Sequence, residues 1–259
     1  MYGAVLGDII GSPYKFDKGE KSKEFELFPP NCMFADDSVM TVAVAQALLE
    51  TGIDSPEEKI KEELIKSMQR WGRQYICAGY EINFLQWILS EDPKPYGSCE
   101  NGSATRVSAV AWLCDSLEQV KKIAKYTAEI SHNHPEGIKG AQAVASCIYM
   151  ARTGKQKDDI KDFIEFEYAY DLSKKLDDIR STYHHIETCQ NTVPEAIIAF
   201  LESTGFEDAV RNAVSLGGDT TGAIAGSIAE AYYGIPHNLL KECKKRLPKE
   251  FIKILNQYE

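Results

Sequence analysis

The 259-residue sequence lacks a long uncharged apolar run and a recognisable leader segment. A bilayer-spanning helix needs roughly 20 consecutive apolar residues, and no uncharged run approaches that length. The opening MYGAVLGDIIGSPYKF has neither the basic start nor the cleavage site of a secretory signal peptide. We therefore expect a soluble protein with no membrane span that stays in the cytoplasm.

The sequence also lacks any excess of basic residues. It contains 29 Lys and Arg against 39 Asp and Glu, a formal net charge of −10 at pH 7. An anionic surface repels the phosphate backbone of nucleic acids unless a local basic patch overrides it. The composition argues against non-specific nucleic-acid binding, and it carries no information on the oligomeric state.

A paired-cysteine motif is missing as well. The seven cysteines are scattered along the chain, with no C-x-x-C pair. An odd number at irregular spacing argues against a disulfide framework or a zinc site. We expect the cysteines to be reduced and mostly buried.

The alternation of apolar and polar residues that is typical of strands is nearly absent. Apolar residues instead recur with the spacing of a helix. Residues 38–49 place apolar side chains three or four apart, which predicts an apolar helix ending near Gly52. Residues 55–58 have the order of a capping box and predict a helix that runs to about Arg73. Further helices are predicted at 81–89, 103–115, 117–130, 137–152, 157–165, 193–201, 206–215, 222–233 and 238–250. Because no stretch has the composition of a flexible linker, we expect a single all-α domain.

Polar residues and glycines stand at the starts of four of these helices. Helix N-termini offer unpaired N–H groups and positive dipole ends, so several that converge would form a site for an anionic ligand such as a diphosphate. Glycine lets such a ligand approach the backbone. The four starts are Asp36-Asp37, Asn101-Gly102-Ser103, the loop from His132 to Gly137, and Gly217-Gly218-Asp219-Thr220.

The two acidic motifs each allow two interpretations. Asp36 and Asp37 repel each other unless a proton or a cation lies between them, and hard oxygen ligands suit Mg²⁺ or Mn²⁺. Alternatively, one of them is the N-cap of the following helix. The loop at 217–222 carries Asp219 and two threonine hydroxyls, and it can equally be a cap and a tight turn.

The histidine and asparagine motifs favour structural roles. His132 and His134 lack the i, i+4 spacing of helical zinc sites, which favours hydrogen bonding and loop shaping over metal ligation. The segment 101–103 is an ordinary turn and N-cap unless the loops converge. His184 and His185 lie in a polar stretch that indicates a surface loop.

Taken together, these blocks resemble the ADP-ribosylglycohydrolase family, which includes the dinitrogenase reductase-activating glycohydrolases. The resemblance implies a compact orthogonal helical bundle that forms one domain over residues 1–259. It also implies hydrolysis at C1 of the distal ribose, which releases ADP-ribose from a modified arginine, serine or other acceptor. The blocks, in the family's order, are GAVLGDIIGSPYKF (3–16), FADDSVMT (34–41), NGSATRVS (101–108), SHNHPEGIKGAQA (131–143), CQNTVPEAIIAFLES (189–203) and SLGGDTTGAIAGSIAEAYYG (215–234).

The same resemblance implies roles for individual residues. A cleft would hold Mg²⁺ or Mn²⁺ beside ADP-ribose, and Asp36 and Asp37 would be catalytic, with anionic groups stabilising an oxocarbenium-like transition state. The metal ligands it implies are Asp36, Asp37, Ser38, Asp219 and Thr220. The substrate-binding residues it implies are Asp8, Asn101, Gly102, Ser103, His132, Glu136, Gly137, Gly140, Gly217 and Gly218.

Three departures from the family pattern affect this chemistry. Lys15 stands where many relatives have a glutamate, Ala35 replaces a threonine, and GGDTTGAIAG is two residues shorter than the family's glycine-aspartate block. Three carboxylates, those of Asp36, Asp37 and Asp219, remain where the family has four. We therefore expect one weakly held cation, or none, instead of the family's two.

Two functions remain open at this stage. The first is an ADP-ribosyl hydrolase in which Asp36, Asp37 or a carboxylate of the segment Glu20, Glu24 and Glu26 replaces the missing glutamate. The second is an impaired family member that binds ADP-ribose or a protein partner without turnover. In that case Lys15 would pair with a diphosphate or with Asp37. An unrelated helical structural protein would require six coincidental blocks.

Overall fold

The computed structural model describes residues 1–16, 21–184 and 186–258. These residues form helices and connecting loops with no strand among them, apart from one antiparallel bridge between Glu100 and Thr188. The predicted all-α class is confirmed. In chain order the helices are α1 (Tyr2–Gly11), the 3-10 turn η1 (Ser12–Tyr14), α2 (Asp36–Thr51), α3 (Glu57–Gln74), α4 (Ile82–Leu89), α5 (Gly102–Thr105), α6 (Ser108–Leu113), α7 (Leu117–Glu129), α8 (Pro135–Arg152), α9 (Lys157–Tyr168), α10 (Leu176–Thr182), α11 (Cys189–Leu201), α12 (Phe206–Gly217), α13 (Asp219–Tyr233), α14 (His237–Lys245), α15 (Lys249–Leu255) and η2 (Asn256–Tyr258).

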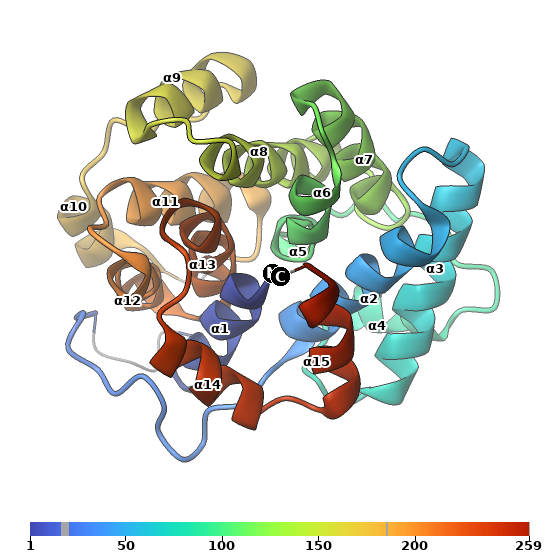
Figure 1. Cartoon of the computed structure of the whole chain (residues 1–259), viewed down its shortest axis with the longest axis horizontal. Helices are drawn as coiled ribbons and strands as arrows, with labels where there is room; N and C mark the ends of the chain where they lie inside the picture. The colour runs from blue at the N-terminus through green and yellow to red at the C-terminus, as the bar shows by residue number, and fades with distance from the viewer. Residues whose placement is uncertain (17–20, 185, 259) are drawn as a thin grey trace.

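Helices α1 and α13 lie at the centre of the bundle, and the other helices surround them (Figure 1). Every residue of α1 is buried. Gly3, Gly7 and Gly11 recur every four residues, so they share one face of α1, and this face packs against α13. A Cβ added at Gly3 would lie 2.2 Å from the carbonyl oxygen of Gly226, and one at Gly11 would lie 2.3 Å from the Cα of Asp219. The two backbones are therefore in direct contact, which no larger residue would permit.

Helix α1 was not among the predicted helices. A helix that is buried on all sides has no polar face, so the amphipathic period that identifies surface helices is absent from its sequence. The spacing of its glycines is the signal that could have found it, because glycine at every fourth position indicates a close helix contact. This contact positions the candidate site, since it fixes Asp8 of α1 beside the start of α13.

Other boundaries differ from the predicted ones in smaller ways. The predicted helix at 103–115 is two helices, α5 and α6, and the predicted helix at 238–250 ends before Pro248, after which α15 begins. Proline has no N–H to continue a helix and restricts the residue before it, so this break was readable from the sequence. Helix α11 begins at Cys189, earlier than predicted, and the short polar helix α10 was missed.

The apolar core draws on both ends of the chain. Its buried side chains extend from Met1 to Leu255. The hydroxyl of Tyr2 donates a hydrogen bond to Oδ1 of Asn256 over 2.7 Å, which joins α1 to the turn η2. Five of the seven cysteines are buried and all seven are free thiols, as expected.

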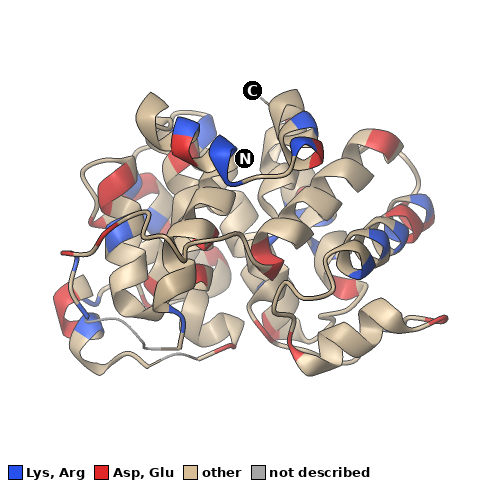
Figure 2. Cartoon of the chain, turned by 90° about the horizontal axis from the view of Figure 1, so that it is seen from below, with Lys and Arg blue, Asp and Glu red and all other residues tan. Residues whose placement is uncertain are grey.

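The outer helices carry charged residues of both signs (Figure 2). Figure 2 shows basic and acidic residues interspersed over these helices in the view that it gives. No helix of the described part of the chain is long and apolar enough to cross a bilayer.

Candidate active site

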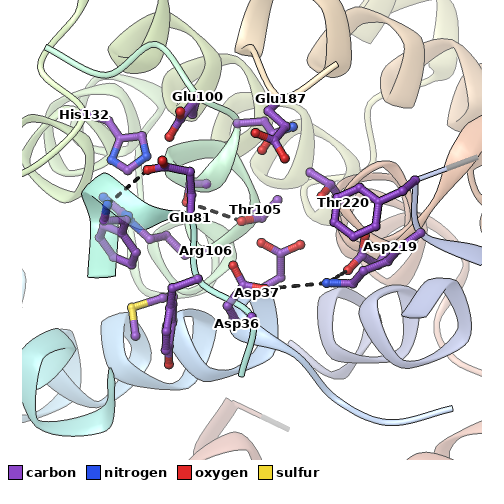
Figure 3. A pocket seen from close by; sticks show the side chains of 18 residues that line it. Asp36, Asp37, Glu81, Glu100, Thr105, Arg106, His132, Glu187, Asp219 and Thr220 are labelled. Atoms are coloured by element: carbon purple, nitrogen blue, oxygen red, sulfur yellow. Dashed lines mark hydrogen bonds and ion pairs between the residues drawn. The ribbon is translucent and has the colours of Figure 1, made fainter. Parts of the chain in front are cut away.

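The helix starts singled out in the sequence meet at one cavity. Its lining includes the first residues of α2 and α13, the turn that opens α5, and the loop before α8 (Figure 3). The convergence expected from the sequence is therefore what the structure shows. The predicted site residues that line the cavity are Asp36, Asp37, Asn101, Gly102, His132, Asp219 and Thr220.

Three buried carboxylates form a compact cluster at this cavity. They belong to Asp8 of α1, Asp37 of α2 and Asp219 of α13, and one oxygen from each lies within 4.8 Å of the others. Asp8 was predicted to bind substrate, but its carboxylate faces the other two aspartates. With Asp36 beside this three-carboxylate cluster, the site has four carboxylates, one more than the motifs alone indicated.

Asp8 links α1 to the start of α2. Its Oδ2 accepts hydrogen bonds from the N–H groups of Ala35 (2.7 Å) and Ser38 (3.2 Å) and from the Ser38 hydroxyl. This carboxylate thus caps α2 from another helix, and Ala35 is the N-cap residue. The interpretation of Asp36 or Asp37 as the N-cap is wrong, because both are already helical. The other oxygen of Asp8, Oδ1, is buried and has no hydrogen-bond partner.

Lys15 reaches into the same cluster. Its ammonium forms an ion pair with Oδ2 of Asp219 and lies 3.7 Å from Oδ1 of Asp36. The predicted pairing with Asp37 is therefore corrected to Asp219 and Asp36. The loop before α13 allows this approach, because Gly218 has a φ of 152°, a conformation that favours glycine. A Cβ there would lie 3.4 Å from the Cα of Lys15.

Burial and mutual repulsion raise the pKa values of these carboxyls. Burial, followed by the charges of Asp37 and Asp219, raises the pKa of Asp8 to about 7. Burial and then Asp219 raise the pKa of Asp37 to about 6, although Lys15 and hydrogen bonds with Thr105 and Thr220 lower it. In the absence of a divalent cation, the cluster therefore retains protons near neutral pH.

The pKa of Asp36 is raised too, by burial and then by the neighbouring charge of Asp37, while Lys15 opposes the shift. For Lys15 itself burial lowers the pKa, but the charges of Asp219 and Asp36 outweigh burial, and the net pKa is raised. Its ammonium therefore stays protonated at neutral pH.

The cavity has further lining residues that sequence reasoning missed. Glu100 and Glu187 lie across the cavity from the aspartates (Figure 3), and Glu81 lines it as well. Glu81 is also the N-cap of α4, where it accepts hydrogen bonds from the N–H groups of Asn83 (2.8 Å) and Phe84 (3.1 Å). Its place at the start of the predicted helix 81–89 was the signal that could have found Glu81. Nothing local marked the other two glutamates.

The structure describes two of the three acidic residues proposed to replace the family glutamate. Glu24 and Glu26 are not among the residues that line the cavity, and Glu20 lies outside the described residues, as does His185. His184 is exposed in a loop, as expected.

Arg106 and His132 form a buried wall of the cavity. Arg106 donates hydrogen bonds to the carbonyl of Thr127 and to the hydroxyl of Ser131, both over 2.9 Å. Nδ1 of His132 is 2.8 Å from the same hydroxyl. Burial, and then the positive charge of Arg106, holds the pKa of His132 well below its usual value. The imidazole is therefore neutral at pH 7, which agrees with the expected hydrogen-bonding role.

The other predicted residues do not line the cavity. Ser38 is held by Asp8, and the Ser103 hydroxyl donates to the carbonyl of Gly137 over 2.8 Å. A Cβ at Gly140 would lie 2.5 Å from the sulfur of Cys189, so this glycine permits close packing. Glu136 pairs with Lys139. Of the remaining two, Gly217 ends α12 and Gly218 connects it to α13.

The cluster suits a hard divalent cation. Mg²⁺ and Mn²⁺ prefer carboxylate oxygens, and Asp8, Asp37 and Asp219 present three at close range. The unpartnered Oδ1 of Asp8 supports this, because a buried carboxylate oxygen without a donor is costly unless a cation or proton satisfies it.

The chain is similar to known proteins over most of its length. The ADP-ribosylhydrolases ARH3 of Gallus gallus and Homo sapiens are 23% and 25% identical to this chain, and each match covers 94% of the chain and 88% of the relative. An uncharacterized protein of Archaeoglobus fulgidus is 27% identical, over 95% of the chain and 83% of the relative.

A solved structure described as an ADP-ribosylglycohydrolase-related protein complex has the same fold. Its TM-score is 0.68 at 22% identity, and the match covers 99% of this chain and 94% of that one. The sequence profile of the ADP-ribosylglycohydrolase family matches residues 1–258. Because that match extends over nearly the whole length, the chain belongs to the ADP-ribosylglycohydrolase family.

Proposed function

We propose that this protein hydrolyses the bond between C1 of the distal ribose of ADP-ribose and an acceptor group. The observation that carries the proposal is the meeting of Asp8, Asp37 and Asp219, which come from three different helices, beside the cavity that the family's motifs line. The family membership and the similarity to ADP-ribosylhydrolases ARH3 support the same reaction.

The charge of the cavity suits the expected transition state. Carboxylates line the cavity on two sides. Among the described side chains of the lining, only Lys15 and Arg106 are basic. Cleavage at an anomeric carbon develops positive charge on the ribose ring. Fixed anionic groups stabilise such charge most strongly where water is excluded.

Asp36 is the residue we assign to positioning and deprotonating the attacking water. It lines the cavity and is half-buried, yet it lies outside the three-carboxylate cluster. Its raised pKa makes it a stronger base than an exposed aspartate. Lys15, 3.7 Å away, favours its ionised form.

Asp8, Asp37 and Asp219 are the residues we assign to a divalent cation, Mg²⁺ or Mn²⁺. Such a cation would supply positive charge that orients ribose hydroxyls and offsets the diphosphate. Thr220 stands next to Asp219 in the same wall. For the substrate, we assign contacts to Asn101, Gly102 and His132, which line the cavity at the starts of α5 and α8.

The second candidate is binding of ADP-ribose without turnover. One observation favours it: Lys15 places an ammonium beside the aspartates, where many relatives have a glutamate. A positive group there opposes the development of positive charge on the ribose.

Release of ADP-ribose from ADP-ribosylated arginine and serine peptides, with and without Mg²⁺, tests the proposal. We expect release from at least one peptide, and we expect Asp36→Asn to abolish it. The matched control is Asp92→Asn, which changes an exposed aspartate that is not part of the cavity lining. If ADP-ribose raises the melting temperature but neither peptide is cleaved, the binder is the correct function.

A further inference from the structure

The acidic cluster already contains a cation that belongs to the chain. The Lys15 ammonium pairs with Asp219 and lies 3.7 Å from Asp36. Its side chain is only 21% exposed, so the pair is largely screened from water. An ion pair in such surroundings interacts more strongly than one on the surface.

The fold holds this ammonium in place. Lys15 directly follows η1, which continues from α1, and Gly11 at the end of α1 is packed against the Cα of Asp219. The Tyr14 hydroxyl donates to the carbonyl of Glu26 over 2.8 Å, and its ring contacts that of Phe25. Contacts with α13 and with residues 25–26 therefore hold the backbone that precedes Lys15. The Lys15 side chain extends from this constrained position.

The four carboxylates differ in what they face, and Asp219 faces both Lys15 and the other two buried aspartates. Asp36 and Asp219 face Lys15, whereas Asp8 has a buried oxygen, Oδ1, with no hydrogen-bond partner. That free oxygen lies in the group formed by Asp8, Asp37 and Asp219. One place for an external cation thus exists, and the ammonium takes the oxygens that a second cation would need.

We propose that the Lys15 ammonium replaces a second divalent cation, so that the chain binds one divalent cation, at Asp8, Asp37 and Asp219. This inference deepens the proposed function, on which it rests for the identity of the site. Four ionised carboxylates carry four negative charges, and one ammonium with one divalent cation carries three positive charges, so the two sets balance to within a single charge. Two divalent cations beside the ammonium would leave net positive charge and set like charges against one another at short range.

Calorimetric titration of the metal-free protein with Mn²⁺ counts the ions directly, and electron paramagnetic resonance distinguishes isolated from coupled Mn²⁺. We expect one ion per chain and an isolated Mn²⁺ signal. Lys15→Gln should bind its first ion about tenfold more tightly, because the competing charge is gone. Lys15→Glu, which adds a carboxylate, should bind two ions and give a coupled signal.

Lys23→Gln is the matched control. It removes an ammonium paired with one aspartate, Asp208, away from the cavity lining, and it should leave both the number of ions and the affinity unchanged. Two bound ions in the unaltered chain would overturn the inference, and so would none. Unchanged affinity in a Lys15→Gln variant that melts like the parent would also overturn it.

The wild-type ion count tests the proposal even if a Lys15 variant does not fold. No substrate is present in these titrations. A chain that binds one ion but releases no ADP-ribose therefore contradicts the proposed function and leaves this inference standing. A chain that hydrolyses substrate with two ions bound supports the proposed function and contradicts this inference.

Discussion

Gly7 of α1 and Gly222 of α13 are in such close contact that a Cβ added at Gly7 would lie 1.9 Å from the carbonyl oxygen of Gly222. The obstacle is backbone, which cannot rotate away as a side chain can. This pair fixes the distance between two helices that each carry one aspartate of the cluster, Asp8 and Asp219. Helix packing and the candidate cation site therefore depend on the same contact.

Gly7→Ala should destabilise the protein strongly, because the methyl group forces α1 away from α13. Overpacking of this kind costs about 3 kcal/mol or more, which corresponds to a fall in melting temperature of roughly 6–12 °C for a chain of this size. Calorimetry on the metal-free protein measures it. At Gly205 nothing lies within 4 Å of an added Cβ, so Gly205→Ala should have a small effect. Equal losses in both variants would contradict the role assigned to the contact.

The stability of the metal-free protein should fall as the pH rises. An aspartate ordinarily has a pKa of 3.8, whereas the pKa of Asp8 is about 7 in the fold, where burial and then Asp37 and Asp219 raise it. Between these values the folded state binds more protons than the unfolded state, so this group's destabilising effect grows with pH and is complete above about pH 7.

The measurement is the melting temperature at pH 5 and at pH 8 in the presence of a chelator. We expect a fall of roughly 5 °C attributable to Asp8. Asp8→Asn, which removes the titrating group, should show a smaller fall than the parent. If the two proteins lose stability in parallel, Asp8 does not titrate as described. Mg²⁺ should stabilise more at pH 8 than at pH 5, because protons compete with the cation for the same oxygens.

Asp36→Asn should lower the rate of ADP-ribose release by about 10²–10⁴-fold, the range typical of a lost general base. Because Asp36 lies outside the three-carboxylate cluster, the number of bound cations should not change. Steady-state kinetics and a Mn²⁺ titration on the same preparation separate the two effects. If Asp36→Asn keeps the rate of the parent protein, Asp36 is not the general base. Glu100 is then the next candidate, because burial and then the charge of Glu81 raise its pKa.

ADP-ribose should bind more weakly when divalent cations are removed. The cavity lining contains six carboxylates and only two basic side chains, those of Lys15 and Arg106, among the described residues, and carboxylates repel a diphosphate unless a cation intervenes. We expect at least a tenfold loss of affinity in a chelator, about 1.4 kcal/mol, and an equal gain in Mg²⁺ affinity when ADP-ribose is present, because the coupling is reciprocal. Calorimetry in both orders of addition checks this. Equal affinities with and without the cation would mean that the carboxylates do not face the diphosphate.

Parts of the site were readable from single motifs. Asp36, Asp37, Asp219 and Thr220 were identified from polar residues at helix starts, and the structure places all four in the cavity wall. Asp8 was associated with the substrate, because nothing in its own segment shows that it faces α2. Glu100 and Glu187 were missed because carboxylates in loops are common, and only a fold that brings distant loops together distinguishes these two.

By itself the sequence determined the all-α class, most helix positions and the family, because hydrophobic period, caps and motif order are local properties of the chain. The tertiary structure alone decided which carboxylates share a cavity and which of them Lys15 neutralises. Those relations depend on how closely α1 and α13 pack and on the path of the loop at Gly218. Both are set by contacts between residues more than 200 positions apart in the chain.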